Sequence, residues 1–216
     1  MKFVDIHTHR PKVSQAIQLV DLSNVKGIGS RINFYYSLGV HPWFVNENKL
    51  DKELQKIENH MRFSPFLAIG ECGLDKICDT DFDLQIKAFE KQIALSEKYK
   101  KPLIIHVVKA FNELMQIRVA SNVKQTWIVH GFNGSPQLAN QLIDLGMYLS
   151  FGVKLNKSDT KASKSIGHIP INRLFLESDD SMIEIEAIYS IASERLQIDI
   201  DQLKAQLWLN FKSLFL

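Results

Sequence analysis

Short apolar runs recur along the chain, and more polar segments separate them. The eight runs are Phe3–Ile6, Ala16–Val20, Tyr35–Val40, Phe66–Ile69, Leu103–Ile105, Trp127–Val129, Met147–Phe151 and Leu174–Leu176. Runs of this length without a polar face are typical of strands in a parallel sheet that is covered on both sides. The pattern therefore predicts eight buried strands.

Longer segments with apolar residues at helical spacing lie between several of these runs. The clearest is Asp81–Tyr99, where Phe82, Ile86, Phe89 and Ile93 recur every three or four positions. The other predicted helices are Leu50–Met61, Phe111–Val119, Pro136–Leu145, Ile183–Arg195 and Ile200–Leu214.

The alternation of strands and helices predicts an α/β fold, a (β/α)8 TIM barrel. No repeat or linker divides the chain, so residues 1–216 are expected to form one domain. Two features favour a distorted barrel or one without one of its helices. The chain has 216 residues, whereas the fold usually takes about 250. The Leu22–Phe34 connection is also too short and too glycine-rich for a good helix.

Composition narrows the class of protein. The chain is 45% apolar and 23% charged with a formal net charge of +2, which gives no strong indication of a nucleic-acid or membrane partner. Cys72 and Cys78 form no CxxC pair, which favours a reducing compartment. No secretory signal or membrane-length apolar stretch is present, so we expect a cytoplasmic protein without an obligate protein partner.

Residues that bind metals follow five of the apolar runs. His7 and His9 come directly after the first run, and side chains two residues apart on a strand point the same way. The residues at the other four run ends are Glu71, His106, His130, Glu177 and Asp179. In a barrel the carboxyl ends of the strands meet on one face, where the active site lies. The sequence therefore predicts a metal site on that face.

Four histidines and two carboxylates are more ligands than one ion needs. Two ions about 3.5–4 Å apart, bridged by a carboxylate, would use all six. The bridge must offer two oxygens, so it is Glu71 or Asp179, and we favour Glu71 because its longer side chain can reach both ions. Such a pair would hold water at a lowered pKa as a nucleophile. Asp179 could bind one ion and accept a proton from that water.

Three further residues are candidate substrate contacts. His41 ends a run on the same face but could equally satisfy a loop, and Asn133 lies in the loop after the sixth run. Glu177 shares the face of Asp179, so it could contact substrate or orient a metal ligand.

Aromatic residues near the run ends could stack a nucleobase. The candidates are Trp43, Phe132 and Phe151, although in a chain with thirteen phenylalanines most aromatic side chains are expected in the core.

Successive segments of the chain resemble the motifs of a known family, the TatD family of metal-dependent hydrolases. These segments are DIHTH (5–9), GVHPW (39–43), AIGECGLD (68–75), PLIIHV (102–107), VHGFNGS (129–135), YLSFG (148–152) and LFLESD (174–179). The family belongs to the amidohydrolase superfamily of metal-bearing, distorted TIM barrels.

The resemblance implies roles for the six predicted ligands. One ion would be held by His7, His9, Glu71 and Asp179, and the other by Glu71, His106 and His130. Family members are typically described as DNases that use Mg²⁺, Mn²⁺ or Zn²⁺. We therefore expect two divalent ions, catalytic roles for Glu71 and Asp179, and DNA or a small phosphodiester as the substrate.

Three departures from the family pattern affect the expected substrate. Val108 stands where relatives often carry Arg, Trp43 replaces the second His of an HPH segment, and Lys76 replaces an aromatic residue. These changes spare the metal ligands but remove phosphate contacts, which Lys76 or Lys109 could replace. An amidohydrolase-type esterase, lactonase or amidase is therefore the alternative. A binding protein without activity is disfavoured, because all six ligands are intact.

Overall fold

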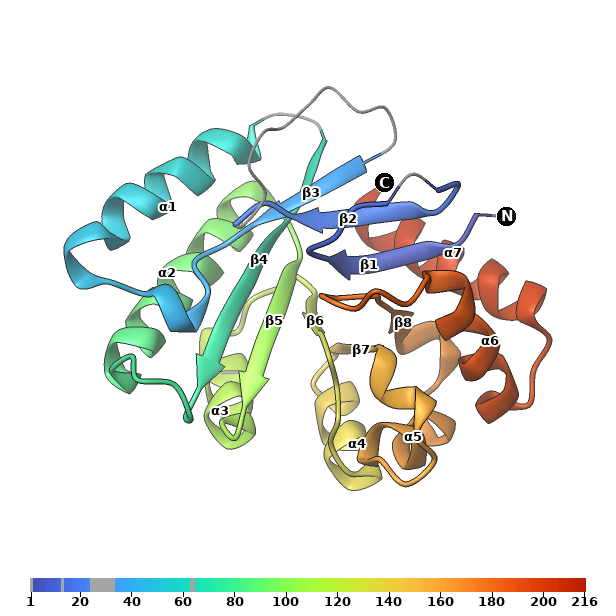
Figure 1. The fold of residues 1–216 in the computed structure, drawn as a ribbon. Helices are drawn as coiled ribbons and strands as arrows, with labels where there is room; N and C mark the ends of the chain where they lie inside the picture. Colours follow the sequence, from blue (N-terminus) through green and yellow to red (C-terminus); the bar gives the residue numbers. More distant parts are fainter. Residues whose placement is uncertain (1, 13, 24–33, 63–64) are drawn as a thin grey trace.

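A computed structural model describes residues 2–12, 14–23, 34–62 and 65–216. It contains an eight-stranded parallel sheet in which the strands follow one another in chain order (Figure 1). The strands are β1 (Val4–Thr8), β2 (Ile17–Asp21), β3 (Phe34–Leu38), β4 (Phe66–Asp75), β5 (Leu103–Val108), β6 (Trp127–Val129), β7 (Tyr148–Phe151) and β8 (Leu174–Leu176). Each predicted run forms a strand, and the predicted TIM-barrel class is confirmed.

The barrel is nearly closed, because a bridge joins Thr8 at the end of β1 to Asp179, which follows β8. The amide of His9 donates to the carbonyl of Asp179 at 3.0 Å, and the amide of Asp179 donates to the carbonyl of His7 at the same distance. We call this contact the seam. It joins the first strand to the residues that follow the last one.

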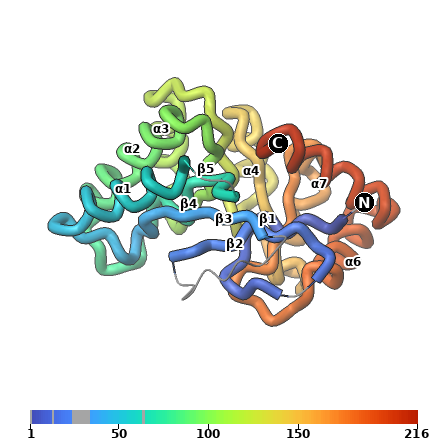
Figure 2. Tube along the Cα trace, turned by 90° about the horizontal axis from the view of Figure 1, so that it is seen from above, coloured from blue at the N-terminus to red at the C-terminus, as the bar shows by residue number. Residues whose placement is uncertain are grey.

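Helices lie around the strands, and in Figure 2 α1 to α3 are to the left of the strands and α6 and α7 to the right. They are α1 (Glu47–Met61), α2 (Phe82–Tyr99), α3 (Phe111–Ser121), α4 (Pro136–Asp144), α5 (Lys161–Ser165), α6 (Ile185–Leu196) and α7 (Ile200–Phe215). Of the described residues, no helix is both long and apolar enough to cross a membrane.

The distortion of the barrel has two observed sources. No helix is described between β1 and β2 in residues 10–12 and 14–16. The segment between β7 and β8 holds only the short α5 and the 3-10 turns η2 (Val153–Asn156), η3 (Ile166–His168) and η4 (Ile171–Arg173). The helix expected to be missing after Leu22 falls mostly on residues 24–33, which lie outside the described residues.

Strand β4 is longer than its apolar run, so Glu71 lies inside the strand rather than after it. Its pairing with β5 shifts between Ile69 and Cys72, as a bulge does. The strand continues because Gly70 and Gly73 have φ angles of +148° and +140°. A Cβ at Gly73 would lie 2.0 Å from the carbonyl oxygen of His106, so only glycine allows this approach.

Two clusters of buried side chains form the core. On β5, Ile105 belongs to the larger cluster together with helix residues such as Phe89 and Leu203. Ile104 points the other way and packs with Ile128 and Phe175 from other strands. Since side chains alternate along a strand, the second cluster fills the barrel, and the side chains of His106 and His130 continue the inward rows that begin at Ile104 and Ile128.

Candidate metal centre

The carboxylate of Glu71 lies at the centre of a ring of imidazoles. Its Oε1 is 2.7 Å from Nε2 of His130, 2.8 Å from Nδ1 of His106 and 3.2 Å from Nε2 of His41. Its Oε2 is 3.3 Å from Nε2 of His9 and 3.4 Å from Nε2 of His7. The structure therefore brings Glu71 and the four predicted histidine ligands together, and it adds His41.

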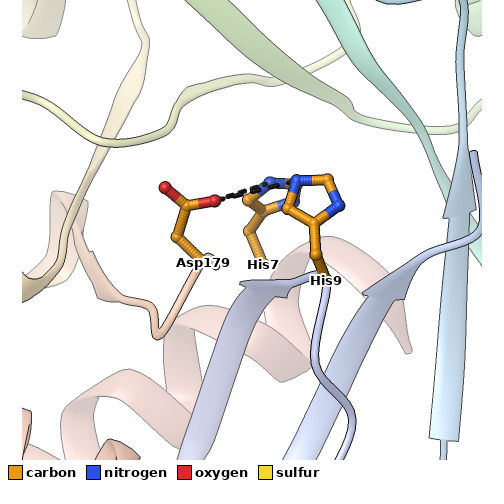
Figure 3. A group of neighbouring side chains, drawn as sticks. All are labelled: His7, His9 and Asp179. Carbon is orange, nitrogen blue, oxygen red and sulfur yellow. Dashed lines mark ion pairs between the residues drawn. The ribbon is translucent and has the colours of Figure 1, made fainter. Parts of the chain in front are cut away.

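His7, His9 and Asp179 form one half of this cluster (Figure 3). Oδ1 of Asp179 is 3.8 Å from Nε2 of His7 and 3.7 Å from Nε2 of His9. Asp179 has a φ of +53°, which aspartate tolerates better than most residues. The seam hydrogen bonds hold its backbone in this conformation, so closure of the barrel positions the carboxylate.

The donor set fits divalent metal ions. Four groups of side chains each offer ligand atoms within 4.8 Å of one another: His7–His9–Asp179, His7–Glu71–His130, His41–Glu71–His106 and His130–Glu177–Asp179. Both ring nitrogens of His7, Nδ1 of His9 and Nδ1 of His130 are buried without a hydrogen-bond partner in the described structure. Buried polar atoms rarely stay unpaired, and imidazole with carboxylate is a common ligand set for such ions.

Neighbouring charges shift the pKa values of three side chains in the cluster, Glu71, His130 and His9. Burial alone raises the pKa of Glu71, but the charge of His130 and hydrogen bonds from His106, His130 and His41 hold it well below its usual range. Burial lowers the pKa of His130, yet the carboxylates of Glu71 and Glu177 raise it well above its ordinary value. The pKa of His9 is also raised, because its bond to Glu71 and nearby carboxylates outweigh burial. Glu71 is therefore an anion.

His106 has a second carboxylate partner, Asp75, which sequence reasoning did not assign. Nε2 of His106 is 3.0 Å from Oδ2 of Asp75, and the indole Nε1 of Trp43 donates to the same oxygen at 2.7 Å. Burial raises the pKa of Asp75, but the hydrogen bonds from Trp43 and His106 bring it below its ordinary value. Asp75 follows Glu71 by four positions on the strand, and this spacing could have placed both on one face.

Two more buried carboxylates, those of Asp21 and Asp5, accept hydrogen bonds from backbone amides in or next to the cluster. Oδ2 of Asp21 accepts from the amide of Glu71 at 2.7 Å and so fixes the backbone of that residue. Asp5 accepts from the amide and the hydroxyl of Ser178 at 2.9 Å and 2.6 Å. Burial outweighs these bonds and raises the pKa of Asp5 to about 7.

The predicted substrate contacts lie in different places. His41 lines the cavity above the cluster. Glu177 is buried, accepts from the amide of Gly131 at 2.6 Å and lies 3.5 Å from Nδ1 of His130. The side chain of Asn133 accepts from the amide of Ala162 at the start of α5. Neither Glu177 nor Asn133 lines this cavity in the described structure, and their substrate roles stay predictions.

A cavity of about 560 Å³ opens over the cluster. Its basic side chain among the described residues is Arg10, whose Nε donates to Oδ1 of Asp180 at 2.6 Å. Lys76 does not line this cavity and instead pairs with Glu113, and Lys109 does not line it either. Arg10 directly follows the HTH segment, which was the signal available in the sequence.

Exposed aromatic side chains border the cavity. Trp43 is 54% exposed and Phe44 is 62% exposed. Phe132 and Phe151 are instead buried against each other with ring centroids 5.6 Å apart, so the suggestion that they stack a base is wrong. Phe132 follows β6 and Phe151 ends β7, and both side chains belong to the larger core cluster rather than to the cluster inside the barrel.

Comparison with known proteins identifies similar sequences and folds. The sequence model of the family described as TatD related DNase matches residues 9–216. An uncharacterized metal-dependent hydrolase of Buchnera aphidicola is 32% identical over 158 residues, which is 72% of this chain and 59% of that protein. The chain spans about three fifths of the length of the first curated relatives that it matches.

Solved structures share the fold. The crystal structure of YjjV, a TatD homologue from Escherichia coli, has a TM-score of 0.85 and 22% identity, over 99% of this chain and 97% of that one. A TatD family hydrolase from Entamoeba histolytica has a TM-score of 0.76 and 18% identity, over 99% of this chain and 98% of that one.

Proposed function

The chain belongs to the TatD family of metal-dependent hydrolases, and from this premise we propose that it is a two-metal phosphodiesterase that cleaves DNA. The observation that carries the proposal is the position of Glu71, with one oxygen toward His7 and His9 and the other toward His106 and His130. A carboxylate in this position can serve two ions at once.

The ligands divide into two groups. His7, His9, Glu71 and Asp179 would hold one ion, and Glu71, His106 and His130 would hold the other. Two ions of Mg²⁺, Mn²⁺ or Zn²⁺ in such a site supply Lewis acidity and lower the pKa of water.

The remaining chemistry falls to residues at the mouth of the site. The side chain of Asp179 is 42% exposed, so its carboxylate can take a proton from water that attacks the substrate. Arg10 borders the same cavity and can pair with the charged oxygens of a phosphate. Trp43 and Phe44 offer exposed aromatic faces to unpaired bases, which favours single strands or ends.

A second candidate function is hydrolysis of a small ester, lactone or amide. Val108 favours it, because it provides no second guanidinium at a position that shares the inward face of His106. A nuclease with fewer phosphate contacts binds DNA weakly and with a shallow dependence on salt.

Initial rates with metal-loaded protein separate the two candidates. The substrates are single-stranded DNA, an activated phosphodiester and a panel of esters and lactones, each assayed with Mn²⁺, Mg²⁺ or Zn²⁺. The Asp179→Asn protein, purified in parallel, is the control for contaminating nucleases. We expect DNA and phosphodiester cleavage that this variant lacks. A kcat/KM for an ester or lactone well above that for any phosphodiester would reject the first candidate in favour of the second.

A further inference from the structure

We propose that Asp75 and Trp43 are positioning residues that make Nδ1, rather than Nε2, the metal-binding nitrogen of His106. The inference rests on the metal site of the proposed function. It concerns two side chains of this chain, one of which, Trp43, stands where the family resemblance leads to a histidine.

The two ring nitrogens of His106 face two different carboxylates. Nδ1 is 2.8 Å from Oε1 of Glu71, inside the cluster, and Nε2 is 3.0 Å from Oδ2 of Asp75, away from it. An ionised carboxylate only accepts hydrogen bonds. Glu71 is an acceptor as well, so without an ion a proton on Nδ1 can point to it. When an ion takes the place of that proton, Asp75 keeps the other proton on Nε2, which leaves the lone pair of Nδ1 for the ion beside Glu71.

Hydrogen bonds fix both the carboxylate and the backbone of Asp75. Oδ2 accepts from the indole of Trp43 at 2.7 Å, and Oδ1 accepts from the amide of Ile77 at 2.9 Å. Gln85 accepts from the amide of Asp75 at 2.7 Å and donates to its carbonyl at 3.0 Å. The carboxylate is buried, so without these donors it has little reason to stay ionised and in place.

The neighbouring ligand, His130, provides an internal comparison. It presents Nε2 to Glu71 at 2.7 Å, and its Nδ1 faces Glu177 at 3.5 Å. The two histidines that share Glu71 thus offer opposite ring nitrogens, and each has a carboxylate behind it. Of these two rings, His106 alone has a hydrogen bond to the second carboxylate, so the comparison isolates the contact with Asp75.

Trp43 combines two properties that a histidine at this position would not. The indole N–H is a donor only and does not titrate in the working pH range, so it holds Asp75 at every pH. Its ring is also 54% exposed at the cavity. One residue therefore connects the cavity wall, through Asp75, to the orientation of a metal ligand.

Two substitutions test this chain of hydrogen bonds. Trp43→Phe keeps an aromatic ring but removes the donor, and Asp75→Asn can turn its amide N–H toward Nε2 of His106. We expect each variant to bind the ion at His106 about 10–100-fold more weakly, as is typical for such hydrogen-bond partners of metal ligands. The ion at His7 and His9 should keep its affinity. Trp208→Phe on α7 is the matched control.

The measurements are titration calorimetry with Zn²⁺ or Mn²⁺ and nitrogen NMR of the imidazoles in the Zn²⁺-loaded protein. In the wild type the proton of His106 should lie on Nε2, and in Asp75→Asn it should move toward Nδ1. Trp43→His, which restores a donor, should recover part of the affinity lost in Trp43→Phe. If Asp75→Asn fails to fold, Trp43→Phe still tests the inference, because its side chain is half-exposed.

Wild-type affinity of both ions in the two variants, or an unchanged tautomer in Asp75→Asn, would overturn the inference. These outcomes differ from a failure of the proposed function. A wild-type protein that binds two ions but cleaves no phosphodiester would leave the positioning role intact. A wild-type protein that binds no ion at His106 would refute both the two-metal site and the inference.

Discussion

Replacement of Glu71 by glutamine should disable at least one half of the metal centre while leaving the fold intact. The amide has the size of the carboxylate but carries no charge, and one of its two ends is a donor. In the structure one carboxylate oxygen faces His106, His130 and His41, and the other faces His7 and His9. Whichever way the amide turns, one of the two groups of histidines would face a donor in place of an oxygen, and the other would face only a neutral oxygen.

The size of the effect follows from these contacts. Loss of a charged partner costs about 1.5–3 kcal/mol per contact, which is about 10–150-fold in affinity per ion. A ligand present at 100 times its Kd stabilises the fold by about 2.7 kcal/mol. For a chain of this size that corresponds to a shift in Tm of about 5–11 °C. At the same metal concentration a 10–150-fold weaker ion stabilises the fold by only about 0.3–1.4 kcal/mol, so the variant should lose about half or more of this shift.

Thermal unfolding with and without Mn²⁺ or Zn²⁺, together with elemental analysis, measures this loss. Glu113→Gln is the matched control, since it neutralises a carboxylate that pairs with Lys76 outside the cluster. It should keep the full metal-dependent shift. The bridging role of Glu71 is wrong if Glu71→Gln retains two ions per chain and the wild-type shift in Tm.

Four further expectations concern single groups. Asp179→Asn should lower kcat by about 10²-fold or more with a smaller change in KM; steady-state kinetics showing the reverse would make it a substrate contact. Val108→Arg should raise the rate on an activated phosphodiester, and an unchanged or lower rate would count against a guanidinium acting there. Because the pKa values of His9 and His130 are raised, metal binding should release protons near neutral pH, and the affinity should fall as the pH falls through those values. Calorimetry in buffers of different ionisation enthalpy measures the proton release. Binding heats that do not depend on the buffer would contradict it. The pKa of Asp5 rises from 3.8 to about 7 on folding, so its contribution to stability is present below about pH 4 and is lost as pH rises through 7. Urea unfolding of chelated Asp5→Asn should lack this loss, and an equal loss in the variant would assign it to another group.

The sequence predicted the strands and the ligand cluster because both depend on a simple relation between pattern and place. Strands buried on two faces appear as apolar runs, and a barrel gathers their carboxyl ends. The histidines His7, His106 and His130 could therefore be placed side by side although they are far apart in the chain. Glu71 lies beside these histidines although its strand continues to Asp75.

The residues that the sequence did not indicate depend on backbone geometry and on irregular connections, which leave no periodic pattern in the sequence. Asp75 reaches His106 because a bulge and two close-packed glycines carry β4 past its apolar run. Arg10 lies on a connection without a periodic pattern. The short α5 was not predicted because one turn and a half of helix leaves too few positions for an apolar period to appear.

The seam also determines how late in the synthesis of the chain the candidate metal site can form. The ribosome synthesises His7 and His9 first, and Asp179 follows only after all eight strands have been synthesised. A growing chain that has not yet released β8 cannot join Thr8 to Asp179, so it lacks the third member of the group in Figure 3. The complete ligand set at the seam thus exists only in chains whose last strand has docked beside the first.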